Sequence, residues 1–281
     1  MCSPDVMHRV ALEVSRRKAL IATGAAAFTA VGPLSRATSA QEATPLAENP
    51  AFPGFSTIVD LTHTWGPDFP VFFGATSPTF EVLATVEVDF FFKMLLQYDE
   101  HVGTHLDAPA HFAADGLTAD LLPVTSFFAP LCIIDISSRA AEDADALGLV
   151  EDIEAFEAEN GPIEPGSFVA LNSGWDATVE EPGAYINLDA DDVQHYPGWS
   201  AEAAAALVER GIVGAGVDTA SLDYGMSTDF AAHLTFLPAG VFGVEGLANL
   251  GDVPVSGAHI IIGAPKHEGA SGGPSRIFAV Y

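Results

Sequence analysis

The chain has 281 residues and a formal net charge of −28, and 49% of its residues are hydrophobic against 17% that are charged. This composition is typical of a globular protein with a full core and argues against a disordered chain. The negative charge repels nucleic acid phosphates and anionic lipid head groups, so binding to nucleic acid is not expected.

The first forty residues have the pattern of an export signal. Arg16 and Arg17 precede an apolar run from Ala19 to about Val31, and small residues follow it. We therefore predict a twin-arginine signal peptide over residues 1–40, and a mature protein that is periplasmic, on the cell surface or secreted. The apolar run is too short and too rich in alanine for a membrane span, so no stable span is expected once the signal is removed. An ordinary amphipathic helix is the alternative.

Basic residues are concentrated in this segment. Five of the ten lysines and arginines lie in the first forty positions, so removal of the signal leaves five basic and 36 acidic residues, a net charge of −31. Residues 41–54, "QEATPLAENPAFPG", are rich in proline and polar residues and predict a linker or mobile arm.

The rest of the chain, residues 55–281, predicts one α/β domain. Two segments, 149–160 and 200–211, have the apolar spacing and end residues of helices, with Ser200 as an expected N-cap and Gly211 as an expected stop. Strands that alternate with a few helices favour a single layered α/β domain. Apolar and β-branched runs predict the strands at 56–63, 79–88, 131–137, 167–173, 211–218, 258–264 and 276–281.

The stretch "HVGTHLDAPAHF" (101–112) concentrates groups that bind metals or transfer protons. In an extended segment His105 and Asp107 point to the same side, and Gly103 before them permits a turn towards His101. Two imidazoles and one carboxylate leave coordination positions open for water, as in catalytic zinc or manganese sites. His111 is either a fourth ligand or a free base beside the metal-bound water.

Two further candidates lie far downstream in largely apolar sequence. His233 and Glu245 are twelve residues apart, and Glu245 stands between Val244 and Gly246 in a segment that resembles a buried strand. A buried carboxylate is costly unless a cation pairs with it, and a metal ion would supply that cation. A local structural role is the alternative for both residues.

These segments resemble the metal-dependent cyclase-like hydrolase family, which includes bacterial kynurenine formamidases and isatin hydrolases. "HVGTHLDAPAHF" is similar to the family motif H-x-G-T-H-x-D-x-P-x-H, and the resemblance extends over roughly residues 56–281. It implies an α/β fold with a mixed, barrel-like sheet flanked by helices. Similar blocks follow in the same order: "LNSGWDA", "GVDTASLDYG", "AHLTFLPAGVFGVEGLANL" and "GAPKHEGASGGPSRIFAVY".

The resemblance also implies a role for each candidate residue. It makes His101, His105 and Asp107 the ligands of a first zinc or manganese ion and His111 the general acid/base. In family members with two ions, Asp107 bridges to a second ion that His233 and Glu245 also bind. The implied reaction is hydrolysis of the C–N bond of a small amide or lactam by metal-activated water.

One segment departs from the family pattern. Formamidases of the family carry a tryptophan in "VWPG", where this chain has "VFFG" with Phe72 at the tryptophan position. We expect Phe72 to bind the substrate, although core packing would also explain it. The change puts an aryl-formamide substrate in question more than it does hydrolysis.

Other functions fit parts of the same pattern. A metal-dependent cyclase, dehydratase or lactonase would use the same ligands, and an exported metal-binding or solute-binding protein would need no His111. The family resemblance also implies a homodimer or homotetramer. The apolar segments "VFFG" and "FFFKMLL" (90–96) are candidates for contacts between subunits.

Overall fold

The computed structural model describes residues 44–45, 54–181 and 183–281. The predicted signal peptide and most of the predicted linker lie outside these residues. Within the segment expected to be a linker, Thr44–Pro45 form strand β1, which pairs with β2. In the part of the chain that is described, no helix has the length and apolar character needed to cross a membrane.

The chain divides into two compact units. The described part of the smaller unit is the hairpin Phe80–Gln97. Strands β3 (Thr79–Ala84) and β4 (Lys93–Gln97) pair with each other. The strand predicted at 79–88 is therefore too long, because helix α2 (Val86–Asp89) and left-handed Phe90 reverse the chain between the two strands. Apolar composition alone did not reveal this reversal.

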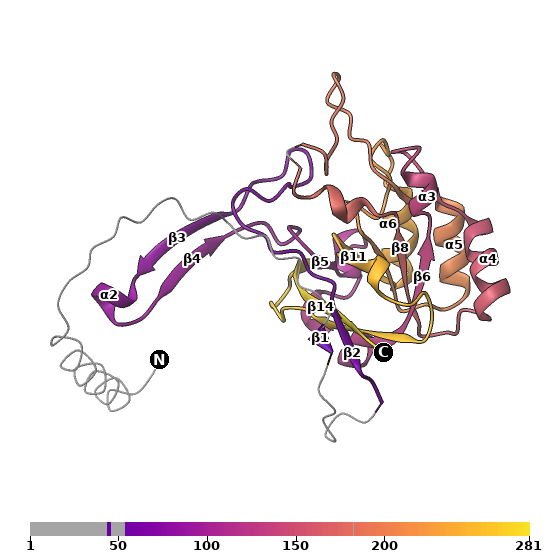
Figure 1. Cartoon of the computed structure of the whole chain (residues 1–281), viewed down its shortest axis with the longest axis horizontal. Coiled ribbons are helices and arrows are strands. Elements are labelled where there is room, and N and C mark those ends of the chain that lie inside the picture. Colours follow the sequence, from indigo (N-terminus) through magenta and orange to yellow (C-terminus); the bar gives the residue numbers. More distant parts are fainter. Residues whose placement is uncertain (1–43, 46–53, 182) are drawn as a thin grey trace. The chain divides into compact units, whose positions relative to one another are not determined.

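The larger unit contains a curled, mixed sheet of ten strands, counted over the described residues (Figure 1). Its centre is parallel, because helices connect β6, β8, β10 and β11 in crossover units. Antiparallel strands extend the sheet on both sides. The strand order, with bounds, is β1, β2 (Thr57–Asp60), β14 (Arg276–Val280), β12 (Ala258–Gly263), β6 (Phe128–Asp135), β8 (Phe168–Asn172), β10 (Gly214–Val217), β11 (Phe242–Glu245), β5 (His105–Asp107) and β13 (Gly272–Pro274).

Alternating side chains of the central strands serve two apolar cores. On β6 and β8, Ile133 and Ala170 belong to one core, and Ile134 and Val169 belong to the other, which packs against the helices. Each strand is thus buried on both faces, which explains its continuous apolar sequence. The mixed α/β fold predicted from the sequence is confirmed.

Helices cover the second of these faces (Figure 1). Helix α4 (Val150–Asn160) buries Ile153 and Phe156, and α5 (Ala201–Glu209) starts at Ser200, whose Oγ accepts a hydrogen bond from the backbone N–H of Ala203. Both predicted helices and the predicted N-cap are confirmed. The shorter elements are α3 (Ser137–Ala140), α6 (Ala231–Phe236), strands β7 (Leu147–Gly148) and β9 (Gly198–Trp199), and 3-10 turns at Pro109–His111, Ala119–Leu121, Val124–Phe127, Trp175–Thr178, Leu237–Ala239 and Leu250–Asp252.

Candidate metal centre and active-site cavity

Strand register brings the two distant candidate segments together. Strand β5 lies between β11 and β13, and in the β5–β11 ladder His105 is opposite Glu245 while Asp107 is opposite Gly243. Opposite residues of an antiparallel pair share a face, and so do residues two apart on one strand. His105, Asp107 and Glu245 therefore project to one side of the sheet. Gly243 leaves room there, since a Cβ at this position would lie 3.3 Å from Asp107 Oδ2.

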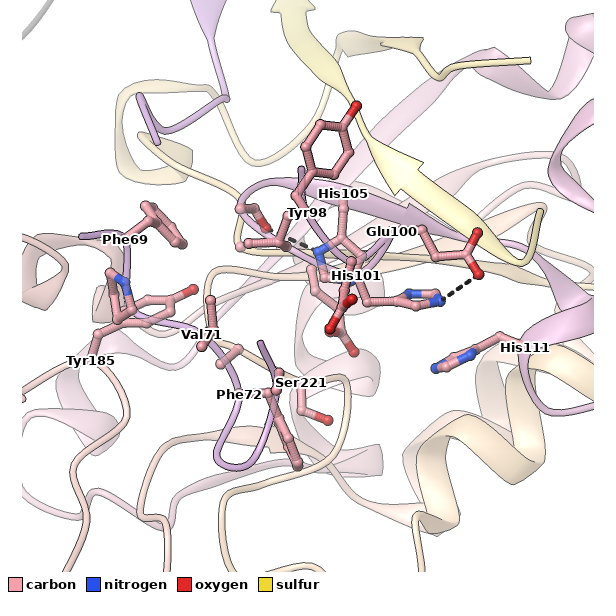
Figure 2. Close-up of a pocket in the computed structure, with 18 of the residues that line it drawn as sticks. Phe69, Val71, Phe72, Tyr98, Glu100, His101, His105, His111, Tyr185 and Ser221 are labelled. Carbon is pink, nitrogen blue, oxygen red and sulfur yellow. Dashed lines mark hydrogen bonds and ion pairs between the residues drawn. The ribbon is translucent and has the colours of Figure 1, made fainter. Parts of the chain in front are cut away.

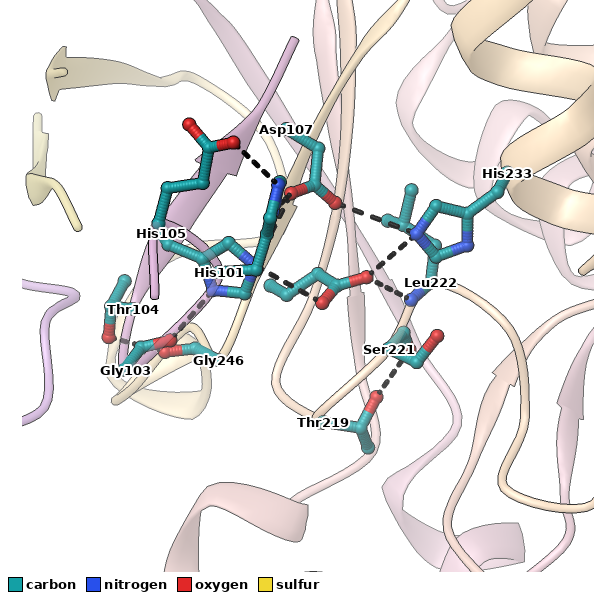
Figure 3. A network of polar contacts seen from close by, with 12 residues as sticks. His101, Gly103, Thr104, His105, Asp107, Thr219, Ser221, Leu222, His233 and Gly246 are labelled. Atoms are coloured by element: carbon teal, nitrogen blue, oxygen red, sulfur yellow. Dashed lines mark hydrogen bonds and ion pairs between the residues drawn. The ribbon is translucent and has the colours of Figure 1, made fainter. Parts of the chain in front are cut away.

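Four side chains converge closely at this point (Figure 3). The Nε2 atom of His105 lies 3.3 Å from Asp107 Oδ1 and 3.3 Å from Glu245 Oε2. His233, on α6, places its Nε2 3.1 Å from Glu245 Oε1 and 3.6 Å from Asp107 Oδ2. All four residues are buried. The alternative of a purely local structural role for His233 and Glu245 does not fit, because both side chains contact residues of the first motif.

The donor set fits a divalent cation. The Nδ1–H of His105 donates to the Gly103 carbonyl at 3.0 Å, so its Nε2 presents a lone pair to the centre of the cluster. This buried nitrogen and buried Asp107 Oδ2 have no hydrogen-bond partner among the described residues. Buried polar atoms are normally paired, and a cation bound by nitrogen and carboxylate oxygen would satisfy both.

The charges of the cluster depend on one another. Burial raises the pKa of Asp107, but the imidazoles of His105, His101 and His233 outweigh it and hold that pKa well below its usual range. Burial works to lower the pKa of His105, and Asp107 and Glu245 nevertheless raise it to about 10. Without an ion the two carboxylates thus favour a second proton on His105, and a divalent ion would take the place of that proton.

His101 and His111 lie on the other side of Asp107. The Nδ1 of His101 is 2.6 Å from Asp107 Oδ1, and the rings of His101 and His111 stack at a centroid distance of 3.9 Å. Burial lowers the pKa of His111, so its imidazole is neutral near pH 7 and can accept a proton. Figure 2 shows His111 beside His101 at the cavity.

Five of the six candidate residues form two ligand groups that share Asp107, and His233 lies beside the group that contains Glu245, with its Nε2 3.1 Å from Glu245 Oε1. One group is His105, Asp107 and Glu245, and the other is His101, Asp107 and His111, each with donor atoms within 4.8 Å of one another. The sequence-based scheme instead grouped His101 with His105 around a first ion. The geometry brings all six residues together but pairs His101 with His111.

The cluster opens into a cavity of about 720 Å³ (Figure 2). Phe72 lines this cavity, and its contact with a substrate stays a prediction, whereas Phe73 is exposed and is not among the lining residues. The described lining contains no lysine or arginine, but it does contain the carboxylates of Asp99 and Glu100 together with Glu245. The lining aromatic residues are Phe69, Phe72, Tyr98, Phe112, Tyr185 and Phe230.

One residue behind the cluster was missed by the sequence analysis. Asp223 Oδ2 accepts a hydrogen bond from His233 Nδ1 at 2.6 Å, and its Oδ1 accepts from the backbone N–H of Ala232 at 2.7 Å. It thereby holds the His233 ring with Nε2 towards Glu245. Nothing in the spacing of "SLDYG" relative to His233 indicates this contact, because it depends on how α6 packs.

Comparisons with known proteins agree with this geometry. Residues 59–224 match the family model described as putative cyclase. Isatin hydrolase of Roseibium aggregatum is 34% identical over 79% of this chain and 91% of its own length. Kynurenine formamidase of Salinibacter ruber is 30% identical over 64% of this chain and 76% of its own length. A crystal structure of an isatin hydrolase bound to the product analogue thioisatinate, at 32% identity, superposes with a TM-score of 0.75 and covers 80% of this chain and 92% of that one.

A buried imidazole–carboxylate cluster that opens into an aromatic cavity, on this curled α/β sheet, defines a metal-dependent hydrolase. The chain belongs to the cyclase family, the family that the sequence motif indicated.

Proposed function

We propose that this enzyme hydrolyses the C–N bond of a small, uncharged aromatic amide or lactam, with one or two zinc or manganese ions bound by the cluster. The observation that carries this proposal is the set of ligand atoms around Asp107 at the floor of an aromatic cavity. The names of the similar proteins support the bond type, since isatin is a lactam and formylkynurenine is an aryl formamide.

Each residue then has a defined task. A bound divalent ion supplies Lewis-acid chemistry, which polarises a carbonyl group and lowers the pKa of water towards about 7. His101, His105, Asp107, His233 and Glu245 would hold the ions. His111 accepts a proton from the attacking water and returns it to the leaving nitrogen. Phe72 packs against the ring of the substrate.

The preference for an uncharged substrate over an anionic one follows from the charges around the cavity. The three arginines of the described chain are each bound to a carboxylate, in the pairs Arg139–Asp152, Arg210–Glu157 and Arg276–Asp60. Lys266 is exposed, and Lys93 belongs to the separate hairpin unit. A substrate carboxylate remote from the reacting carbonyl would therefore lie near Asp99 and Glu100, and no cation of the cavity lining would offset the repulsion. Each close pair of negative charges would cost about 1 kcal/mol or more.

A matched pair of substrates tests the proposal. The purified enzyme should hydrolyse the methyl ester of 4-formamidobenzoate at its formamide bond faster than it hydrolyses 4-formamidobenzoate itself. It should also open isatin. Treatment with a chelator should abolish turnover, and zinc or manganese should restore it. Full turnover without metal, or turnover of simple lactones only, would contradict the assignment.

We also propose that the protein is a homodimer or homotetramer, with the hairpin as a contact surface. In this hairpin large apolar side chains are exposed to an unusual extent, for example Val88 at 75% and Phe92 at 59%. An isolated two-stranded hairpin is marginally stable, and contiguous exposed apolar side chains typically mark an interaction site.

Export by a signal over residues 1–40 is the last part of the proposal. Its support is the arginine pair and the apolar run in the sequence. Expression of the full chain with Arg16 and Arg17 replaced by lysine should retain the protein in the cytoplasm. The unmodified chain should appear outside the cytoplasm, shortened by about forty residues in mass spectrometry.

A further inference from the structure

A chain of hydrogen bonds connects His101 to an acidic residue at the edge of the cavity. His101 Nε2 lies 2.9 Å from Ser271 Oγ, and Ser271 Oγ donates to Glu100 Oε1 at 2.6 Å. The second oxygen of Glu100 accepts from the backbone N–H groups of Ser271 at 3.0 Å and Gly272 at 3.3 Å. Figure 3 shows His101 at the centre of the polar network.

The direction of these bonds fixes the tautomer of His101. Because the Ser271 hydroxyl donates its proton to a carboxylate, its oxygen is available to accept one from His101 Nε2–H. With the proton on Nε2, the lone pair of His101 lies on Nδ1, the atom that faces Asp107. A separation of 2.6 Å between Nδ1 and Asp107 Oδ1 requires a proton or a cation shared by the two atoms, so Nδ1 would be the ligand atom of His101 when an ion is bound.

The other two imidazoles of the cluster are oriented the opposite way. His105 donates its Nδ1–H to a backbone carbonyl and His233 bonds through Nδ1 to Asp223, so both present Nε2 to the centre. Those partners are buried, whereas the side chain of Glu100 is 39% exposed. His101 is therefore the imidazole of this cluster whose orientation depends on a side chain at the cavity surface.

The same contacts also fix the backbone around the ring. Strand β13 begins at Gly272, which is paired with Asp107 across the ladder. A Cβ at Gly272 would lie 2.7 Å from His101 Cε1 and 2.3 Å from the Leu106 carbonyl oxygen, so the ring packs directly on this backbone. Glu100 thus connects the loop before β5 to the start of β13, with His101 held between them.

We infer that Glu100 and Ser271 form a relay that positions His101 with Nδ1 towards the metal centre and keeps its ring stacked on His111. This inference rests on the proposed metal site, but not on the identity of the substrate. Hydrogen-bond partners behind a histidine ligand set its tautomer and its ring orientation, and their loss typically weakens metal binding by about 10- to 100-fold.

Metal affinity of the purified full-length protein tests the relay without any substrate. Glu100→Gln and Ser271→Ala should each weaken binding of Zn²⁺, measured by competition with a chromophoric chelator, by about 10- to 100-fold. The Zn²⁺ affinity of the double variant should be at most about threefold lower than that of the weaker-binding single variant, because both changes break one relay. The visible spectrum of the Co²⁺-loaded protein should change in all three variants. Glu268→Gln, which removes an exposed carboxylate from the same segment, is the matched control and should bind like the wild type.

Zn²⁺ affinity within twofold of the wild type in both single variants, with an unchanged Co²⁺ spectrum, would overturn the relay and leave the proposed hydrolysis standing. Independent, multiplicative losses in the double variant would also overturn it. A wild-type protein that binds neither Zn²⁺ nor Co²⁺ would overturn the metal site and the relay together.

Discussion

His111 occupies a position that distinguishes catalysis from simple metal binding. Its ring stacks on that of His101 at a centroid distance of 3.9 Å and lies edge-on to that of His233 at 5.9 Å, so it is close to histidines from both segments of the cluster. As the general base, it should be needed for turnover and not for metal retention. As a fourth ligand, it should be needed for both.

Replacement of His111 by asparagine should therefore leave the metal content unchanged and lower kcat by at least about 100-fold, the usual contribution of a general base. Elemental analysis and turnover of the same preparation make this measurement. Loss of an ion together with activity would show that His111 is a ligand. Turnover within tenfold of the wild type would remove it from the mechanism.

Asp223 acts on the site through His233 and not through contact with the substrate. Its carboxylate accepts a hydrogen bond from the ring at 2.6 Å and also binds the backbone at the start of α6. Asp223→Asn keeps the size of the side chain but removes the charge that favours this bond. We expect Zn²⁺ affinity to fall by about 10- to 100-fold.

The control for this variant is Asp229→Asn, in the same loop, where the carboxylate accepts a 3.3 Å hydrogen bond from the Ser227 hydroxyl. Competition with a chelator should give the wild-type affinity for Asp229→Asn. Equal affinities for the two variants would mean that the packing of α6 alone orients His233.

The sequence indicated which residues belong to the site but not how they are arranged. His105 and Asp107 could be placed on one face because a strand alternates its side chains. Their approach to Glu245 could not be predicted, since it depends on the pairing register of β5 with β11. Asp223 and Ser271 were missed for a similar reason, because serine and aspartate are common in loops and only the fold brings these two next to histidine ligands.

At the level of elements, apolar runs were more informative than turns. The central strands and both long helices were predictable because they are buried and periodic. Strand β13 has the sequence Gly-Gly-Pro, which has low strand propensity, and it exists because β5 presents an open edge to it. The first strand of the hairpin was predicted too long, over 79–88, because its turn, Val86–Asp89, is as apolar and acidic as the strand before it, and β4 was not predicted as a strand.

Among the described residues, the hairpin exposes several large apolar side chains next to one another. Phe92→Asp, at a side chain that is 59% exposed, should shift the purified protein to smaller oligomers because it places a charge in the proposed contact. Light scattering coupled to size-exclusion chromatography measures the mass. Leu121→Asp, at 61% exposure in the larger unit, is the matched control and should keep the wild-type mass. An unchanged mass in both variants would exclude this hairpin as the contact.

The whole molecule carries a large excess of negative charge, and its basic groups do little to offset that excess near the cavity. The arginine pairs join α3 to α4, the end of α5 to α4, and β14 to β2. Carboxylates that crowd the metal centre are therefore balanced from within the cluster, by imidazoles or by bound cations. We therefore expect the stability of the fold to depend on whether this site holds a cation.

Metal removal should accordingly lower the thermal stability of the entire larger unit. A ligand present at 100 times its dissociation constant adds about 2.7 kcal/mol to the free energy of unfolding. For a chain of this size, each kcal/mol raises Tm by about 2–4 °C, so we expect a gain of roughly 5–10 °C when zinc or manganese is added to chelator-treated protein. Differential scanning calorimetry measures the shift.

The control is His105→Ala, which removes the ligand whose buried Nε2 has no hydrogen-bond partner in the described structure. This variant should show little or no shift under the same conditions. Equal shifts in the wild type and His105→Ala would mean that the ions bind elsewhere, because only binding at this cluster depends on His105.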